Sequence, residues 1–242
     1  MQFEEFCGIF RSVMTQNGFS AYADEAHAKR FYDLTVRMLE TNEKMNLTAI
    51  KEEAAIVLLH YADSLTAVRF LPQNARIADI GCGAGFPCLP LAICRPDLQI
   101  LALDSTEKRI RYVAETAAAL GCNNLSAVAM RAEDGGQGCH REQFDVCTAR
   151  AVAALPLLAE LCLPYVRIGG SFLAMKGKRG EEELAEARSA IQRLGGECKA
   201  VHRITLQGGA EEETRYLIEI QKVRATPKEF PRPWAKILKK PL

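Results

Sequence analysis

The amino-terminal part of the chain carries apolar side chains at helical spacing. Side chains on one face of an α-helix recur at intervals of three and four, and five do so here: Phe3, Phe6, Ile9, Phe10 and Val13. Asn17-Gly18 is expected to end this helix, and Ser20 is expected to cap the next. The same spacing predicts two further helices, with Phe31, Leu34, Met38 and Leu39, and then Ile56, Leu59, Ala62, Leu65 and Val68. Residues 1–70 are therefore predicted to form a helical extension.

From residue 75 short β-type runs alternate with helical ones. Strands are predicted at 77–80, 100–104, 125–130, 144–149 and 171–175. A short helix at 89–94, one beginning at a Ser105 cap and closed by Gly121, and one over about 152–165 are predicted between them. Another, marked by Leu184 and Ile191, follows the fifth strand. Strands that alternate with helices in this way build right-handed βαβ units and a parallel sheet.

The carboxy-terminal part of the pattern differs. Residues 201–206 and 215–222 have strand character, and no helix fits between them. Two such strands are expected to pair antiparallel as a hairpin. The chain is therefore assigned to the α/β class, with the Rossmann-like methyltransferase layout: a mainly parallel seven-stranded sheet over 71–222 that ends in an antiparallel hairpin. A basic tail, 223–242, follows.

Charge is balanced overall and uneven along the chain. The 242 residues include 31 basic and 30 acidic side chains, and 48% of them are hydrophobic, enough for a sizeable core. From Lys222 to Leu242 seven cations face one anion, Glu229. Such a tail indicates either a polyanionic partner or a solubilising segment.

Cysteine usage points to a reducing compartment. Nine cysteines are present, an odd number, and none forms a C-x-x-C pair, so neither a disulfide framework nor a zinc site is indicated. The amino terminus lacks a signal-peptide layout, and no apolar run approaches the roughly 20 residues of a membrane-spanning helix. The expectation is a cytoplasmic protein without a metal.

The strongest local motif is D-I-G-C-G-A-G-F-P at 79–87. Gly81, Gly83 and Gly85 follow a predicted strand, where glycine lets a ligand approach the backbone. Asp104 ends the next strand, where an acid suits two ribose hydroxyls. In the dinucleotide fingerprint G-x-G-x-x-G the third glycine would stand at Phe86, so S-adenosylmethionine is favoured over a nicotinamide cofactor. Asp79 adds a carboxylate that suits the cationic sulfonium or the amino group of the cofactor.

Several blocks together resemble one family. They are N-E-K-M-N-L-T-A-I at 42–50, H-Y-A-D-S-L at 60–65, the glycine block at 78–93, L-D-S-T-E-K-R at 103–109, R-A-E-D at 131–134, A-R-A-V-A at 149–153 and G-G-S-F-L-A-M-K-G at 169–177. The chain thereby resembles the glucose-inhibited division protein B family, the small-subunit rRNA methyltransferase G family. The resemblance implies S-adenosylmethionine-dependent methylation of guanine N7 in 16S ribosomal RNA, with the small ribosomal subunit as partner.

The resemblance also implies site residues. Cofactor contacts fall on Gly81, Phe86, Ala132, Glu133 and Arg150, beside Asp79, Gly83, Gly85 and Asp104 from the loop argument. Catalytic candidates are Arg150, Lys176, Asn46 and His60, with Asp63 and Ser64 in the same blocks. His60 could equally be a partly buried helix histidine bonded to Asp63. The polar run 131–134 could meet the adenine amino group or be a solvated loop.

RNA contacts are expected from cations near the site and in the tail: Lys178, Arg179, Arg232, Lys236, Lys239 and Lys240. Trp234 and Phe230 could stack on a base or pack the tail onto the body. Two departures from the family stand out, because Cys88 replaces a usual glycine and the middle of the tail carries Trp234 without a glycine. Cys147 is interpreted as a buried strand cysteine, since the proline that would precede a nucleophile is absent.

The chemistry that the resemblance implies needs no general base. Guanine N7 has a lone pair and no proton, so in-line attack on the sulfonium methyl depends on proximity and alignment. Two other hypotheses remain open: a methyltransferase for a small metabolite, independent of the basic tail, and a non-catalytic RNA-binding factor that does not bind S-adenosylmethionine. The protein is expected to be a monomer.

Overall fold

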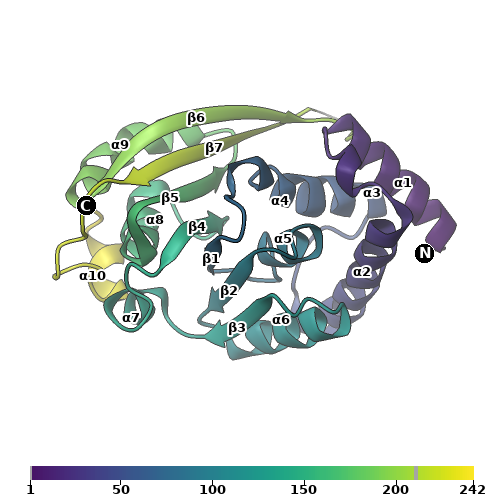
Figure 1. Cartoon of the computed structure of the whole chain (residues 1–242), viewed down its shortest axis with the longest axis horizontal. Coiled ribbons are helices and arrows are strands. Elements are labelled where there is room, and N and C mark those ends of the chain that lie inside the picture. Colours follow the sequence, from purple (N-terminus) through teal and green to yellow (C-terminus); the bar gives the residue numbers. More distant parts are fainter. Residues whose placement is uncertain (1, 210–211) are drawn as a thin grey trace.

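A computed structural model describes residues 2–209 and 212–242 and has one mixed sheet at its centre (Figure 1). The strands are β1 (Arg76–Ile80), β2 (Gln99–Asp104), β3 (Leu125–Ala129), β4 (Phe144–Arg150), β5 (Val166–Lys176), β6 (Gly196–Leu206) and β7 (Glu213–Lys222). Their order is β3-β2-β1-β4-β5-β7-β6. The first five run parallel, and β7 pairs antiparallel with both β5 and β6. The predicted fold class is confirmed.

Helices cover both faces of this sheet. They are α5 (Cys88–Cys94), α6 (Glu107–Ala119), α7 (Ala132–Gln137), α8 (Leu155–Cys162) and α9 (Gly180–Arg193). Successive strand residues point to opposite faces, so Ile77 joins one hydrophobic cluster and Ala78 the other. Because both faces are buried, the central strands are continuous apolar runs, as parallel sheets require.

The amino-terminal helices share the core of the sheet. They are α1 (Phe3–Gln16), α2 (Glu25–Met45), α3 (Glu53–Ile56), a π-helical turn over Val57–Ala62, and α4 (Asp63–Leu65). Phe31 lies between Phe10 and Tyr61, with ring centroids 5.0 and 4.7 Å away. All three rings belong to the cluster that contains Ile77. The helical extension therefore packs against the sheet and shares one hydrophobic cluster with it.

Two predicted helix caps are wrong. Asp24, not Ser20, caps α2, because its Oδ1 accepts the His27 N–H at 2.9 Å, while Ser20 begins a short 3₁₀ turn. Thr106, not Ser105, precedes α6. In both places a neighbouring polar residue one to four positions later competes for the same cap, and local sequence does not separate them.

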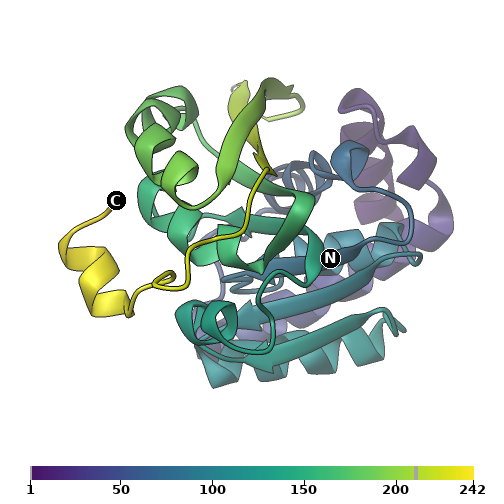
Figure 2. The same cartoon turned by 60° about the vertical axis from the view of Figure 1, so that its left-hand side comes forward.

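The carboxy-terminal segment 223–242 runs back over the body of the molecule (Figure 2). It ends in a short helix, α10 (Trp234–Lys239), which contacts α8. Phe230 and Ile237 are buried in the same cluster as α8. Neither α7 nor α10 is predicted from sequence, because glycine pairs and flanking prolines indicate loops there. Within the described ranges, no helix is both long enough and apolar enough to cross a membrane.

Candidate functional site

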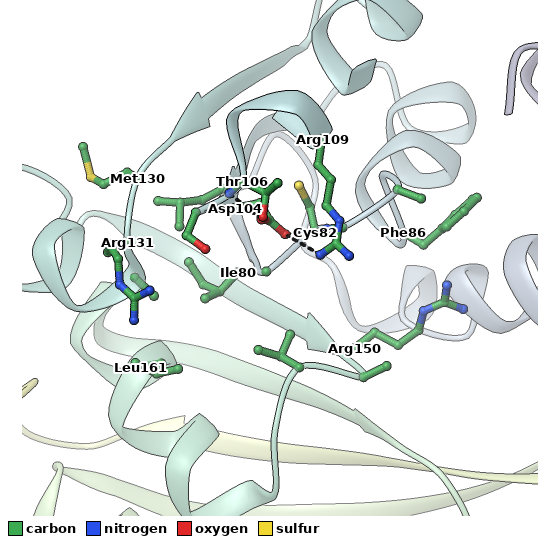
Figure 3. Close-up of a pocket in the computed structure, with 18 of the residues that line it drawn as sticks. Ile80, Cys82, Phe86, Asp104, Thr106, Arg109, Met130, Arg131, Arg150 and Leu161 are labelled. Atoms are coloured by element: carbon green, nitrogen blue, oxygen red, sulfur yellow. Dashed lines mark hydrogen bonds and ion pairs between the residues drawn. The ribbon is translucent and has the colours of Figure 1, made fainter. Parts of the chain in front are cut away.

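A cavity of about 490 Å³ opens at the carboxyl ends of β1, β2 and β4 (Figure 3). This edge is where open α/β sheets bind their ligands. The cavity wall includes Leu47, His60, Gly81, Gly83, Phe86, Asp104, Thr106, Arg109, Met130, Arg131, Ala132, Glu133, Arg150, Val152, Leu161 and Trp234. Residues from both the glycine block and the H-Y-A-D-S-L block thus meet in one place.

The loop after β1 needs glycine at two positions. Gly81 has φ +71°, and its N–H bonds to the Leu103 carbonyl at 2.7 Å. A Cβ there would lie 2.6 Å from the Val152 side chain, and one at Gly85 would lie 2.3 Å from Leu89. Both separations are too short for real atoms, so these glycines let the chain turn where β1, α5 and the segment after β4 meet.

Asp104 stands at the centre of the cavity wall. Its Oδ2 accepts the Gly83 N–H at 3.1 Å and its Oδ1 accepts the Thr106 N–H at 2.8 Å. Arg109 Nη1 lies 3.9 Å from the same carboxylate. A carboxylate has about four acceptor positions, so two backbone bonds leave room for two hydroxyl donors. Asp104 is thus fixed by the loop that it faces and still able to bind a diol.

Asp79 lies behind the loop and is absent from the cavity wall. Its Oδ2 accepts the Cys88 N–H and its Oδ1 accepts the Thr148 hydroxyl, both at 3.1 Å. Burial raises the pKa of Asp79 to about 6. In place of the expected contact with a sulfonium, these bonds support a role in holding the glycine loop against β4.

Asp79 should make the stability of the protein depend on pH. Because its folded pKa is above its ordinary 3.8, the stability that it contributes is fully present below pH 4 and is lost as the pH rises through 6. The loss is about 3 kcal/mol. Between pH 4 and pH 7 we therefore expect the unfolding free energy of the wild type to fall by about that much relative to Asp79→Asn. Urea denaturation at each pH measures it, with exposed Asp134→Asn as control, and a pH-independent difference would contradict the assignment.

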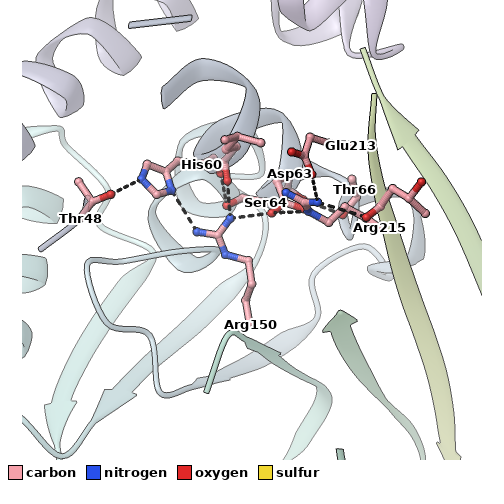
Figure 4. Close-up of polar contacts among 10 residues, drawn as sticks. Thr48, His60, Asp63, Ser64, Thr66, Arg150, Glu213 and Arg215 are labelled. Carbon is pink, nitrogen blue, oxygen red and sulfur yellow. Dashed lines mark hydrogen bonds and ion pairs between the residues drawn. The ribbon is translucent and has the colours of Figure 1, made fainter. Parts of the chain in front are cut away.

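Arg150 is held at the other end of the cavity by several partners (Figure 4). Its Nη1 donates to the Leu59 carbonyl at 2.9 Å and to Asp63 Oδ2 at 3.0 Å. The guanidinium lies over the Phe86 ring at 5.3 Å, and His60 stacks on the same ring with centroids 4.5 Å apart. The cluster gives this end of the cavity one cation in a fixed orientation.

The hydrogen bonds fix the protonation of His60. Arg150 Nη2 can only donate, so His60 Nδ1, 3.4 Å away, accepts. The proton therefore sits on Nε2, which donates to Thr48 Oγ1 at 2.9 Å. Burial, followed by the charge of Arg150, lowers the pKa of His60 to about 3. A neutral imidazole of such low basicity is a poor general base. His60 was expected to be either a catalytic residue or a partly buried helix histidine bonded to Asp63. The structure shows a buried histidine whose partners are Thr48 and Arg150 in place of Asp63.

Asp63 pairs with two arginines. Its Oδ2 lies 3.0 Å from Arg150 Nη1 and 3.4 Å from Arg215 Nε. Arg215 comes from β7, where Glu213 also pairs with it at 2.7 Å. The terminal hairpin is thereby tied to the Arg150 cluster, a link between distant segments that the sequence did not reveal.

Two catalytic candidates from the sequence lie outside the cavity wall. Asn46 is exposed and occupies the left-handed position that ends α2, with φ +50°. Lys176 is buried, and its Nζ donates to the Ala153 carbonyl at 2.6 Å and pairs with Glu183 at 2.7 Å. These contacts support structural roles: Asn46 ends α2 before Leu47 reaches the cavity, and Lys176 holds the loop between β4 and α8.

The RNA-binding candidates differ in exposure and in the ion pairs that they form. Lys178 and Arg179 are exposed after β5, at the same sheet edge as the cavity, although Arg179 pairs with Glu182. Lys236, Lys239 and Lys240 are exposed on and after α10. Arg232 instead bonds Glu160, with Nη2 2.6 Å from Oε2. Phe230 is buried, so base stacking by it is replaced by packing of the tail.

Some wall residues were not anticipated from sequence. Leu47 lies in the block 42–50, in which only Asn46 was a candidate, and Thr106 lies two residues after Asp104. Trp234 comes from the tail, where the sequence suggested stacking on an RNA base or packing of the tail, and its place in the cavity wall was not expected. Across the described ranges, no group of three or more histidine, cysteine, aspartate or glutamate side chains could hold a metal ion.

Sequence comparison identifies relatives over nearly the whole chain. The family model described as rRNA small subunit methyltransferase G matches residues 25–212. A protein of that name from Lactobacillus delbrueckii is 41% identical over 240 residues, covering 97% of this chain and 98% of the relative. Another, from Staphylococcus carnosus, is 47% identical over 206 residues and covers 84% of each chain.

Structural comparison supports the fold. M. jannaschii TYW2 in complex with AdoMet aligns with TM-score 0.51 at 11% identity, over 66% of this chain and 77% of that one. Precorrin-6y C5,15-methyltransferase from Geobacter metallireducens aligns with TM-score 0.50 at 17% identity, over 74% and 91%. At such low identity these likenesses concern the fold alone.

Proposed function

Because the chain belongs to the rRNA small subunit methyltransferase G family, we propose that it transfers the methyl group of S-adenosylmethionine to N7 of a guanine in 16S ribosomal RNA. The observation that carries the proposal is the meeting of two separate sequence blocks in one cavity. The glycine loop with Asp104 supplies a nucleoside site, and Arg150 with His60 and Phe86 supplies a second, cationic end.

The cavity suits S-adenosylmethionine in size and in donors. Its volume of about 490 Å³ lies within the usual range for small-molecule sites, about 300–1,000 Å³. Asp104 would accept the two ribose hydroxyls, Gly81 and Gly83 would let the ligand approach the backbone, and Ala132 and Glu133 would flank the adenine. The bound cofactor supplies an electrophilic methyl group on a sulfonium.

The side chains at the cavity suit a reaction that depends on alignment. Guanine N7 offers its lone pair without losing a proton, so the low basicity of His60 is no obstacle. Placing the two reactants in line can supply much of the rate enhancement. The flat His60–Phe86 stack would form one wall beside the reacting atoms. We therefore propose that these two rings shape the end of the cavity where the methyl group would be transferred.

Arg150 would orient the guanine. Arginine is the commonest protein partner of the O6 and N7 edge of guanine, and a donor to O6 leaves N7 free to attack. The base becomes positively charged as the methyl arrives, which a bare guanidinium would oppose. Asp63, 3.0 Å from Arg150, offsets that charge while keeping the donors in place. Arg150 and Asp63 would thus offer hydrogen bonds to the guanine with little net repulsion of its developing positive charge.

Asp104 should determine the affinity for the cofactor. Hydrogen bonds to charged groups contribute about 1.5–3 kcal/mol, so we expect Asp104→Asn to raise the Kd for S-adenosylhomocysteine about 10- to 100-fold. Isothermal titration calorimetry measures this, with Glu115→Gln at an exposed position of α6 as the matched control. An unchanged affinity in Asp104→Asn would place the ribose elsewhere.

Transfer of label from S-adenosylmethionine tests the choice of substrate. Small ribosomal subunits lacking the modification, and naked 16S RNA, would be incubated with methyl-labelled cofactor. We expect label in the RNA of at least one of them. Cofactor binding without RNA labelling would favour the small-metabolite hypothesis, and no cofactor binding would favour the non-catalytic RNA-binding factor.

We also propose a location and an oligomeric state for the protein. A ribosomal substrate implies action in the cytoplasm, as the sequence led us to expect. We propose that the protein acts as a monomer, as expected from the sequence. Exposed Lys178, Lys236, Lys239 and Lys240 would contact phosphates, with an affinity that falls as salt is added.

A further inference from the structure

We propose that Trp234 forms the nucleobase end of the cofactor cavity, so that the docked carboxy-terminal segment is part of the cofactor site. The inference rests on the proposed function and adds a residue that lies beyond residues 25–212, the part matched by the family model. The ligand group that Trp234 would meet is a purine base.

The position of Trp234 in the cavity supports this assignment. Figure 3 shows Arg150 and Phe86 at one end of the cavity. It shows Met130, Arg131 and Leu161 on the other side of Asp104. Arg131 lies over the ring of Trp234, with its guanidinium carbon 5.8 Å from the ring centroid. Trp234 therefore belongs to the end opposite Arg150, on the side where the adenine would lie.

That end of the cavity is built to be rigid. Tyr165 donates its hydroxyl hydrogen to the Ala132 carbonyl at 2.8 Å, which fixes the start of α7. Arg131 Nε donates to Glu133 at 2.8 Å, so the cation over the indole is itself held. Trp234 is half-buried against the cluster of α8. An aromatic face held in this way can pack on a base at little entropic cost.

Several internal bonds hold the segment that carries Trp234. The Arg232 backbone N–H and its Nε both donate to Glu160 Oε1 at 2.8 Å, and Glu160 is completely buried in α8. Arg141 Nη1 donates to the Phe230 carbonyl at 2.7 Å, and Gln137 donates to the Pro231 carbonyl at 2.9 Å. The three residues directly before Pro233 are thus anchored, which positions the indole that follows.

The chain offers a direct optical test, because Trp234 is its only tryptophan. Emission excited at the indole would be followed while wild-type protein is titrated with S-adenosylhomocysteine, and separately with adenosine. We expect a saturable change with the Kd that calorimetry gives for each ligand. Adenosine should produce the same change as S-adenosylhomocysteine, since the base alone reaches Trp234.

Variants test the energetic contribution. Base–aromatic contacts of this kind correspond to a loss of about tenfold in affinity when the ring is removed, so we expect Trp234→Ala to raise the Kd for S-adenosylhomocysteine about tenfold. Trp234→Phe should stay within about threefold of the wild type. Leu238→Ala, at a 59% exposed position of the same helix, is the control that should leave the Kd unchanged.

The outcomes separate this inference from the proposed function. Calorimetric binding by the wild type without an emission change, and with a Kd for Trp234→Ala within about twofold, overturns the role of Trp234 and leaves the methyltransferase proposal intact. Failure of the wild type to bind S-adenosylhomocysteine at all overturns both. If Trp234→Ala does not fold, the emission titrations of the wild type and the Kd of Trp234→Phe still test whether Trp234 contacts the base.

Discussion

Replacing Arg150 by alanine is expected to lower the rate of methyl transfer to small-subunit RNA by about 100-fold or more. Loss of one oriented donor in an enclosed site commonly reduces rates by about 10²–10³, and in the proposed mechanism Arg150 would also align the rings beside the reacting atoms. Its guanidinium contacts Phe86 at 5.3 Å and His60 at 3.4 Å. The measurement is single-turnover methyl transfer at saturating S-adenosylmethionine.

Arg150→Lys is the matched variant for this experiment. Lysine keeps the charge and a partner for Asp63 but lacks the planar fork, so we expect its rate to be nearly as low as that of alanine. The Kd for S-adenosylhomocysteine should change less than tenfold in both variants, because Asp104 and the glycine loop remain. A rate for Arg150→Ala close to that of the wild type would remove Arg150 from the mechanism.

The second large effect concerns stability. Arg232→Ala leaves the carboxylate of Glu160 buried without its cation, since Arg232 Nη2 lies 2.6 Å from Oε2 and Glu160 is completely buried. Breaking one partner of a buried pair costs about 3–5 kcal/mol. Arg232 is partly exposed, so we expect about 3 kcal/mol. That loss corresponds to a fall in Tm of about 6–12 °C for a chain of this size.

A double variant separates the buried charge from general damage to the tail. Adding Glu160→Gln to Arg232→Ala removes the unpaired charge while keeping an oxygen for the residue 232 N–H, and we expect it to recover at least half of the lost stability. Lys239→Ala, an exposed cation of the same segment, should leave the Tm unchanged. Equal stabilities for Arg232→Ala and the wild type would show that the pair does not hold the tail.

The fold could be predicted from sequence because its signals are local and periodic. The helical spacing from Phe3 to Val13, the strand-ending glycine loop at Gly81 and the final hairpin each lie within about 20 residues. Those features determine a parallel sheet with an antiparallel edge. The antiparallel pairing of β6 with β7 follows from their short connection, whereas the position of β7 next to β5 does not.

The candidate site could be predicted only where a residue acts near its own motif. Asp104 and Phe86 line the cavity as expected. Lys176 also lies in a matching block, but it forms an ion pair with Glu183 on α9 and does not line the cavity. Arg232 was expected to meet phosphate, whereas Glu160, 72 residues earlier in the chain, binds it. The partners of these cations cannot be predicted from a periodic pattern, because such a pattern gives the face of an element and not the side chain that a residue will bind.

The packing of the carboxy-terminal tail on the body could not be predicted from its charge pattern either. Its six cations, counted with Lys222 at the end of β7, suggested a solubilising segment or a polyanionic partner. The buried side chains between them, Phe230 and Ile237, determine instead that the segment packs on the body. Charge counts reveal nothing of this, because the lysines point outward while the anchors point inward. Trp234 therefore reaches the cavity from a part of the chain that sequence reasoning assigned to RNA.

The central claim is best tested by mapping the methylated atom. Small subunits that lack the modification would be treated with the protein and S-adenosylmethionine, and their 16S RNA cleaved with borohydride and aniline, which cut at N7-methylguanine. The account predicts a single new cleavage that is absent after treatment with Arg150→Ala. Methylated RNA without any new cleavage would contradict the assignment to guanine N7.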